Sequence, residues 1–406
     1  MRIETRVVYL AMTAVLSFGS GLIMPAYVVY YVRTASLGPL ELVLVGTVLE
    51  ASYFLSNVPT GAFADTYGRR WAIVLGVGII GLGWFIQALI PVFAFILLAE
   101  VVRGIGSAFE DGATDAWIAD EVGDAALPAL FARASQVQRL AYLGGLGGSV
   151  ALATISYAAP MVAGAAVSLV VAVGLAFGLR EPAFRRPAER QSWRGIVTTA
   201  RQSAGLVRRR PLLLTLFAAT ALTGAASEGF DRLSEPHVLT LLPAALAPVI
   251  ALAGIDVLKT IVGIGMGEIA HRAARAAMPV LGPLLAMAEA MQIALTVVFA
   301  LASGFPLAAA ALLSGSAVGS VTRPLYRAWL TASIEPRVRA TVLSMHSLCN
   351  AGGQIAGGPV IGVVGSLFSI PAALITGTAF LVPNVFLYLR AGDHARAMGA
   401  PAEVTP

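Results

Sequence analysis

Acidic and basic side chains interrupt several long apolar stretches of this sequence, and these side chains are where chemistry is expected. Between residues 92 and 119, five polar side chains recur at steps of three and four residues: Glu100, Arg103, Ser107, Asp111 and Thr114. On a helix, that spacing places all five on one face. Ionisable groups among apolar residues are costly to bury, so each is a candidate for binding a charged substrate or a proton.

Charged residues also interrupt two later apolar stretches. Glu228 and Asp231 lie between residues 211 and 241, and Arg323 and Arg327 lie between residues 304 and 333. Near the start of the chain, Tyr27 shares a helical face with other polar side chains, although ordinary packing explains such a stripe equally well. Eight residues are therefore candidates for contacting a substrate: Tyr27, Arg103, Asp111, Asp115, Glu228, Asp231, Arg323 and Arg327. The alternative for the stretch 92–119 is an internal salt bridge such as Glu100 with Arg103, and the two interpretations can coexist.

Glu50 and Asp256 are two further acids in apolar stretches. An isolated carboxylate in such a place costs several kcal/mol when ionised, so it tends to be neutral or paired. Asp256 has Lys259, the only lysine of the chain, one turn away and is expected to pair with it. Glu50 has no basic residue within one turn. We therefore predict Glu50, with Asp256 and Glu100, as proton-coupling residues; the alternative for Glu50 is a protonated side chain in a helix contact.

The chemistry of a soluble enzyme is not indicated. The four histidines are not spaced as a metal-binding pair, and no Gly-Lys-Ser/Thr phosphate loop occurs. The sequence predicts no catalytic residue, no metal and no cofactor, and hence no enzyme.

The composition predicts that a lipid bilayer covers most of the surface. Hydrophobic residues make up 58% of the 406 and charged residues only 12%, and the mean hydropathy is +0.82. A soluble domain carries about 25% charged residues. The net charge of +5 does not indicate nucleic acid as a partner, because most of the basic residues lie in short connections between apolar stretches. We expect a monomer in the inner (plasma) membrane.

Twelve stretches are long and apolar enough to cross a bilayer, and at this length they are helices. Their predicted bounds are 7–33, 39–63, 71–90, 92–119, 129–157, 159–180, 211–241, 245–270, 276–302, 304–333, 340–366 and 370–390. Arginines gather in the even-numbered connections and beside both ends of the chain, whereas several odd-numbered turns carry no charge. Both termini are therefore expected in the cytoplasm.

The spans form two halves with related sequences. We predict a six-helix bundle at residues 1–180, a basic cytoplasmic linker at 181–210 with a surface helix near 193–206, a second bundle at 211–390 and a cytoplasmic tail at 391–406. The segment 61–69 matches 267–275 at an offset of 206, which also maps Glu50 onto Asp256. An offset of 212 maps Asp111 and Asp115 onto Arg323 and Arg327. Such repeats are typical of transporters that alternate around a central site.

The segment Gly61-x-Phe63-Ala64-Asp65-x-x-Gly68-Arg69-Arg70 resembles the signature between helices two and three of the major facilitator superfamily. The details are most similar to bacterial drug-efflux members of the macrolide and tetracycline exporter type. The resemblance implies an all-α integral membrane protein with twelve transmembrane helices in two six-helix pseudo-symmetric halves around a central cavity.

The same resemblance implies a gating motif made of Gly61, Asp65, Gly68, Arg69, Arg70 and Asp120. Gly61 would let another helix approach closely. Asp65 would meet the amino-terminal end of a neighbouring helix, which is helix eleven in the family. Arg69 would pair with the acid that ends helix four, here Asp120. The alternative is that Arg69 and Arg70 only enforce topology.

Two departures from the efflux pattern concern proton antiport. Glu100 stands where many efflux members have an arginine in helix four, and the glycine-rich segment 144–148 in helix five lacks the usual proline. The leading functional prediction is proton-coupled efflux of small amphipathic compounds or drugs by alternating access. The alternatives are a proton-coupled uptake symporter for a small metabolite, a membrane-embedded enzyme, and a non-transporting receptor or assembly subunit.

Overall fold

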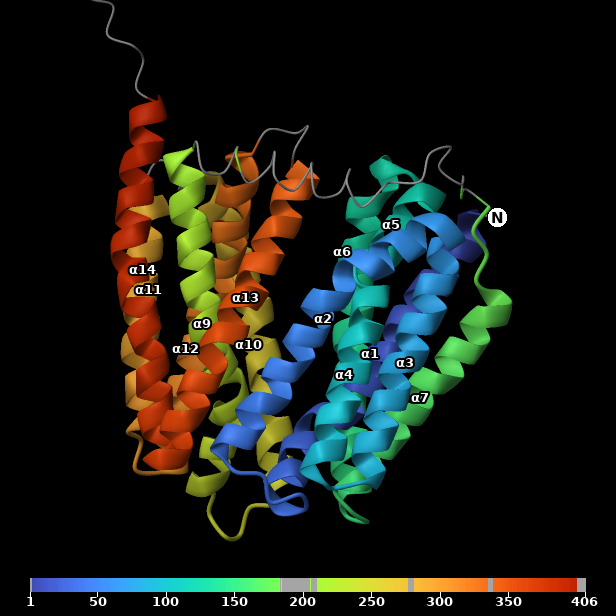
Figure 1. The fold of residues 1–406 in the computed structure, drawn as a ribbon, viewed down its shortest axis with the longest axis horizontal. Helices are drawn as coiled ribbons and strands as arrows, with labels where there is room; N and C mark the ends of the chain where they lie inside the picture. Colours follow the sequence, from blue (N-terminus) through green and yellow to red (C-terminus); the bar gives the residue numbers. More distant parts are fainter. Residues whose placement is uncertain are drawn as a thin grey trace, which may run out of the picture. The chain divides into compact units, whose positions relative to one another are not determined.

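The computed structural model describes residues 2–182, 184, 205, 210–276, 281–334 and 339–399, and every regular element in them is helical (Figure 1). The first group of elements is α1 (Arg2–Arg33), α2 (Pro39–Tyr67), α3 (Arg69–Leu89), α4 (Phe93–Glu110), α5 (Ala113–Val122), the short 3₁₀ helix η1 (Asp124–Ala126), α6 (Leu127–Ala153) and α7 (Ala158–Gly178). The second group is α9 (Pro211–Leu241), α10 (Pro248–Ala276), α11 (Leu281–Ala300), α12 (Phe305–Ala332), α13 (Arg339–Leu367) and α14 (Ile370–Gly399). Most of the predicted linker, with its surface helix, and the end of the tail lie outside the described residues.

Each of the twelve predicted spans corresponds to a helix, which confirms the predicted fold class of a twelve-helix membrane protein. Within the described residues, nine helices are long and apolar enough to cross a membrane by length and composition alone. The helix α4 does not reach that standard, because its 18 residues include Glu100, Arg103 and Glu110. A helix with this many charges stays in a membrane only where its polar groups are shielded by neighbouring helices.

The fourth predicted span is wrong in one respect, because it is divided into α4 and α5. The backbone leaves the helical region at Asp111, with φ −62° and ψ 126°, and turns at Gly112 with φ +72°. That left-handed conformation is accessible to glycine at no steric cost. The helical spacing that the sequence suggested from Glu100 to Thr114 therefore does not continue through the break.

The chain separates into two compact units, Met1–Gln191 with Leu242–Val257, and Ser192–Leu241 with Leu258–Pro406. In the first unit, α1 packs against α6 and α7, α2 against α4, and α3 against α4 and α7. The contact of α1 with α6 is a backbone contact, because a Cβ added to Gly145 would lie 2.2 Å from the carbonyl oxygen of Phe18. Small residues allow membrane helices to approach this closely.

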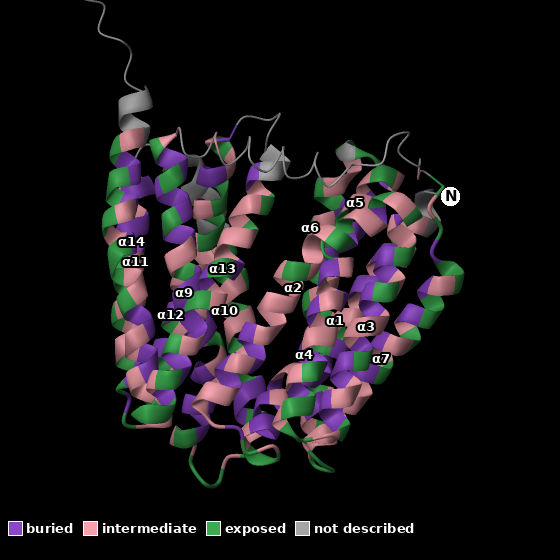
Figure 2. Ribbon diagram, viewed as in Figure 1, coloured by how far each residue is buried: buried purple, intermediate pink, exposed green. Residues whose placement is uncertain are grey.

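In the second unit, α9 packs against α13 and α14, and α11 packs against α12 and α14. The most apolar window of α9 is 67% buried, more than that of any other candidate span in the described residues (Figure 2). The buried core of this unit includes Leu216, Trp329 and Tyr388. The helix α9 therefore forms the centre of its unit.

Candidate functional site

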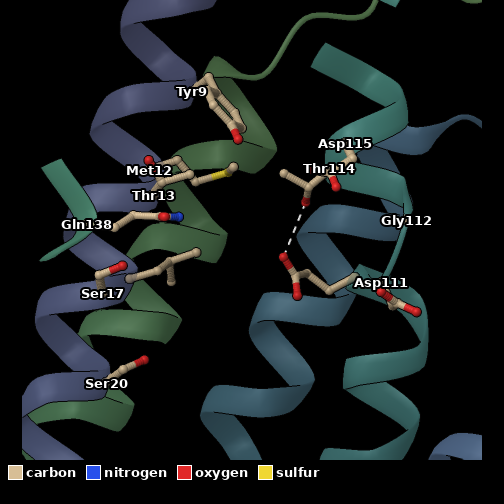
Figure 3. A pocket seen from close by; sticks show the side chains of 12 residues that line it. Tyr9, Met12, Thr13, Ser17, Ser20, Asp111, Gly112, Thr114, Asp115 and Gln138 are labelled. Carbon is tan, nitrogen blue, oxygen red and sulfur yellow. Dashed lines mark hydrogen bonds between the residues drawn. The ribbon is translucent and has the colours of Figure 1, made fainter. Parts of the chain in front are cut away.

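A pocket of about 250 Å³ opens in the first unit between α1, the α4–α5 break and α6 (Figure 3). Twelve residues line it: Tyr9, Met12, Thr13, Leu16, Ser17, Ser20, Glu110, Asp111, Gly112, Thr114, Asp115 and Gln138. Three of these twelve are acids, none is basic, and most of the others carry a hydroxyl or amide group. The pocket is therefore acidic and rich in hydrogen-bonding groups.

The helix break creates the acidic wall of this pocket. The end of α4 and the start of α5 form one side of the pocket and contribute Glu110, Asp111 and Asp115 to its lining, and the polar residues of α1 lie on the opposite side (Figure 3). On α1, Ser17 and Ser20 lie three residues apart and face the same pocket. The predicted polar face of span one is therefore shared between two places, because Ser17 and Ser20 line the pocket whereas Tyr27 packs against Trp84 and Tyr31.

The three carboxylates are held differently. The Thr114 hydroxyl donates to Oε1 of Glu110 at 3.3 Å (Figure 3), and the Tyr53 hydroxyl donates to Oδ2 of Asp111. Asp115 is exposed and has no hydrogen-bond partner within the described residues. The negative charges of Asp111 and Asp115 both act on Glu110, and like charges this close repel one another. A proton or another cation would relieve that repulsion.

Sequence analysis predicted Asp111 and Asp115 for this site but missed Tyr9, Glu110 and Gln138. A signal for Glu110 was available in the sequence, because this residue lies next to Asp111 in the predicted polar stripe from Glu100 to Thr114. Tyr9 carried no signal, because a tyrosine near the start of a span is usually an interfacial residue.

Glu100 and Arg103 form a buried ion pair outside this pocket. Arg103 Nη1 donates to both oxygens of the Glu100 carboxylate at 2.7 and 2.8 Å, and the Glu100 side chain is 1% exposed. Gln87 Nε2 donates to the same carboxylate at 3.0 Å. The guanidinium carbon of Arg103 lies 3.6 Å from the centre of the Trp84 ring, which adds a cation–π contact. This arrangement is the internal salt bridge that the sequence left open as an alternative.

Aromatic side chains pack around the Glu100–Arg103 ion pair. Tyr27 contacts the rings of Trp84 and Tyr31 edge to face, at centroid distances of 5.7 and 5.4 Å. The Tyr31 hydroxyl donates to Gln87 Oε1. Tyr27 and Arg103 therefore belong to one packed cluster with Glu100 and do not line the acidic pocket.

The two arginines of the predicted gating motif contact different helices. Arg69 forms an ion pair with Asp120, the partner that the resemblance implied, and its Nη1 also donates to the carbonyl oxygen of Ala116 at 2.6 Å. The side chains of Arg69 and Asp120 are 25% and 50% exposed. Arg70 donates to the carbonyl oxygen of Ala176 at the end of α7.

Glu181 is a member of this cluster that sequence analysis missed. Its carboxylate accepts the backbone N–H groups of Arg69 at 2.9 Å and of Arg70 at 3.1 Å, and so caps the amino-terminal end of α3. Gly68, just before α3, has φ +101°, and a Cβ there would lie 2.7 Å from Glu181 Oε2. No local pattern predicts a capping residue 112 positions away.

Gly61 and Asp65 make no contact of this kind in the first unit. A Cβ added to Gly61 would meet nothing within 4 Å, and Asp65 is exposed without a hydrogen-bond partner among the described residues. The predicted contact of Asp65 with helix eleven, and the close approach of another helix to Gly61, stay predictions.

The candidate residues of the second unit lie mainly on α9 and α12. Arg232 Nε donates to Glu228 Oε1 at 3.0 Å, so Glu228 is held in an ion pair on its own helix. Asp231 and Arg323 are exposed, and the charges of Arg232, Arg323 and Lys259 act on Asp231. Arg327 is exposed one turn beyond Arg323. Arg323 and Asp231 therefore lie close enough for their opposite charges to interact.

Glu50 and Asp256, the two predicted proton-coupling acids besides Glu100, differ in their surroundings. The charge of Glu50 acts on Tyr53, the residue that donates to Asp111, so Glu50 is linked to the acidic pocket through one side chain. Asp256 Oδ2 accepts a hydrogen bond from the Tyr142 hydroxyl at 3.1 Å within the first unit. Glu289 on α11 accepts a hydrogen bond from Nδ2 of the buried Asn384 at 3.2 Å.

Comparison with known proteins agrees with this fold. The sequence profile of the Major Facilitator Superfamily matches residues 9–291. An uncharacterized MFS-type transporter of Bacillus subtilis (strain 168), YxaM, is 20% identical over 386 residues, which are 94% of each chain. A bacterial homolog of the human lysosomal transporter Spinster, in an inward-facing and unoccupied conformation, superposes with a TM-score of 0.79 at 16% identity over 99% of both chains. The nucleoside transporter NupG superposes with a TM-score of 0.73 at 15% identity over 98% of this chain and 100% of its own.

The chain therefore belongs to the major facilitator superfamily. It is a multi-pass membrane protein and a secondary transporter of small molecules that works by alternating access. The solved structures share the fold at low identity, and what they transport is a property of those proteins.

Proposed function

We propose that this protein is a proton-coupled exporter of small amphipathic compounds, acting as a transporter and not as an enzyme. It works in the cell membrane with both termini in the cytoplasm, and its six-helix halves, residues 1–180 and 211–390, alternate access. The observation that supports the proposal is the acidic pocket, in which Glu110, Asp111 and Asp115 lie together without a basic lining residue. The resemblance to macrolide and tetracycline exporters of the superfamily supports the direction.

Coupling follows from the chemistry of carboxylates in a low dielectric. A carboxylate that binds a positive group must be ionised, whereas the same carboxylate crosses the membrane at lower cost when it is protonated. Proton and substrate then exclude each other, and each transport cycle exchanges one for the other. Glu50 is the proposed proton carrier beside this pocket, because its charge acts on Tyr53, whose hydroxyl donates to Asp111.

The gating part of the proposal rests on the cluster at the start of α3. Arg69 joins α3 to Asp120 on α5, and Glu181 joins the same turn to the segment after α7. We infer that this cluster holds one end of the first unit rigid while Asp65 engages and releases the other half during the cycle. Asp256 is a second proposed coupling residue, whereas Glu100 is engaged by Arg103 and is a less suitable proton carrier.

The test is counterflow and accumulation in proteoliposomes with and without an imposed pH gradient, against a panel of dyes, antibiotics and metabolites. We expect uphill movement of an amphipathic compound in exchange for protons. Movement in the same direction as protons would support the uptake symporter instead, and lack of any flux would support a receptor or assembly subunit. Glu50→Gln should keep substrate exchange and lose proton-driven accumulation; a full gradient in this variant would show that Glu50 is only structural.

A further inference from the structure

We propose that the acidic pocket binds a protonated primary or secondary amine, with its ammonium group between Tyr9, Glu110 and Asp115. This inference rests on the proposed function, because it names the class of substrate that the exporter carries. The amine is the polar head of the amphipathic compound.

The first argument is the charge of the pocket. Glu110 and Asp115 lie on the same wall, and Asp111 adds a third negative charge beside them. The charges act on one another, and no lining residue is basic. An anionic ligand would add to this repulsion, and a neutral ligand would leave it in place. A cation is the ligand that removes it.

The second argument is the hydroxyl of a buried tyrosine, which has no hydrogen-bond partner among the described residues. The Tyr9 side chain is 4% exposed, yet its hydroxyl lines the pocket and makes no hydrogen bond with any described residue. Figure 3 shows this hydroxyl directed across the pocket toward the acidic wall, and the charges of Asp115 and Glu110 act on it. Because the ring is packed in place and the hydroxyl is open to the pocket, a ligand bound there is the group that can complete its hydrogen bonds.

The third argument selects an amine with N–H bonds. Ionised carboxylates only accept hydrogen bonds, and the Tyr9 oxygen can accept one as well. A primary or secondary ammonium donates two or three hydrogen bonds, which matches these acceptors. A quaternary ammonium donates none and is usually held by several aromatic rings. Tyr9 is the one aromatic side chain among the lining residues.

The fourth argument is size. The volume of about 250 Å³ is below the range of about 300–1,000 Å³ typical of sites that enclose a whole drug-sized ligand. Met12 and Leu16 supply an apolar side on α1. The pocket therefore fits a polar head and its first carbon atoms, and the rest of the molecule extends beyond it.

The experiment measures equilibrium binding to the purified full-length protein in nanodiscs, without a pH gradient. The probe is radiolabelled phenethylamine, and the competitors are a panel of primary and secondary alkyl and aryl amines, 2-phenylethanol and the N-trimethylated form of phenethylamine. We expect the amines to compete, and we expect the alcohol and the trimethylated compound to bind at least about tenfold more weakly. Failure of every amine in the panel to bind at millimolar concentration would overturn the proposal. Equal binding of 2-phenylethanol or of the trimethylated compound would also overturn it.

Variants locate the site. Glu110→Gln and Asp115→Asn should each weaken amine binding at least about tenfold, and Tyr9→Phe by about threefold to tenfold. Asp115→Glu keeps the negative charge and should bind the amine more tightly than Asp115→Asn does. This comparison separates the loss of the charge from misfolding. Matched controls are Glu121→Gln, which removes a carboxylate of α5 outside the pocket lining, and Tyr67→Phe, which removes a hydroxyl that is exposed at the end of α2. Unchanged affinity in both acid variants would overturn the assignment.

Binding and transport fail separately in this design. Amine binding that depends on Asp115 but gives no proton-driven flux would retain the site and overturn the proposed exporter. Proton-driven export of a compound that does not compete with the amine would retain the proposed exporter and overturn the amine site.

Discussion

Replacing Glu100 with glutamine should destabilise the first unit, because Glu100 is the buried partner of a buried cation. Arg103 Nη1 donates to both oxygens of Glu100 at 2.7 and 2.8 Å, and the side chains are 13% and 1% exposed for Arg103 and Glu100. A glutamine would present N–H groups to the guanidinium where the second carboxylate oxygen lay. The positive charge of Arg103 would then be uncompensated at this place.

The size of the effect follows from what remains around Arg103. Removing one partner of a buried ion pair costs about 3–5 kcal/mol. The Trp84 ring, 3.6 Å from the guanidinium carbon, still holds the cation, and the glutamine oxygen keeps one hydrogen bond worth about 1 kcal/mol. We therefore expect a loss of about 2–3 kcal/mol in the free energy of unfolding. In a chain of 406 residues, that lowers the apparent Tm by roughly 2–4 °C.

The assay is the apparent Tm of the purified protein in one detergent, followed by size-exclusion chromatography after heating. Glu100→Gln is compared with the double variant Glu100→Gln/Arg103→Met, which removes the cation as well. The double variant should regain most of the lost stability, because it leaves no buried charge without a partner, and Gln87 can still hydrogen-bond to the amide oxygen at position 100. A single variant with the parental Tm that has lost proton-driven accumulation would refute this reasoning and make Glu100 a coupling residue.

Three further outcomes are expected. Gly145→Ala should lower the apparent Tm by an amount equivalent to about 1–3 kcal/mol, because the new methyl group would lie 2.2 Å from the Phe18 oxygen. The control is Gly147→Ala, whose methyl group would meet nothing within 4 Å and should be neutral or stabilising. Equal Tm values for the two variants would contradict the close contact of α1 with α6. Glu181→Gln should cost about 1 kcal/mol through the weakened cap of α3, measured as a lower Tm, and an unchanged Tm would contradict that role. Asp65→Asn should impair transport while expression and Tm stay near the parental values, and undiminished flux in proteoliposomes would remove Asp65 from the gate.

Hydropathy predicted the helices of this protein well, because the backbone in lipid must satisfy its own hydrogen bonds. The span predicted at 211–241 matches α9 (Pro211–Leu241), and the one predicted at 159–180 matches α7 (Ala158–Gly178). The positions at which the helices end were less predictable from hydropathy. The last span, predicted at 370–390, is part of α14 (Ile370–Gly399), because a helix continues past its apolar part as long as its residues favour it.

The break between α4 and α5 was a missed signal. An Asp-Gly pair at residues 111 and 112 is a common turn sequence, yet the polar spacing on both sides suggested a continuous helix. The left-handed backbone of Gly112 divides the span, and this division forms the acidic wall of the pocket.

The family, the membrane spans and the set of charged residues among them were therefore predictable from the sequence. These depend on composition and on motifs within a few residues of one another. The partner of each charge, in contrast, depends on how the helices pack. The tertiary structure engaged Glu100 with Arg103, placed Glu181 on the first turn of α3, and brought Tyr9 to face Glu110 and Asp115. Hydropathy is a local property of the chain, whereas the partner of a buried charge is chosen by which helices pack together.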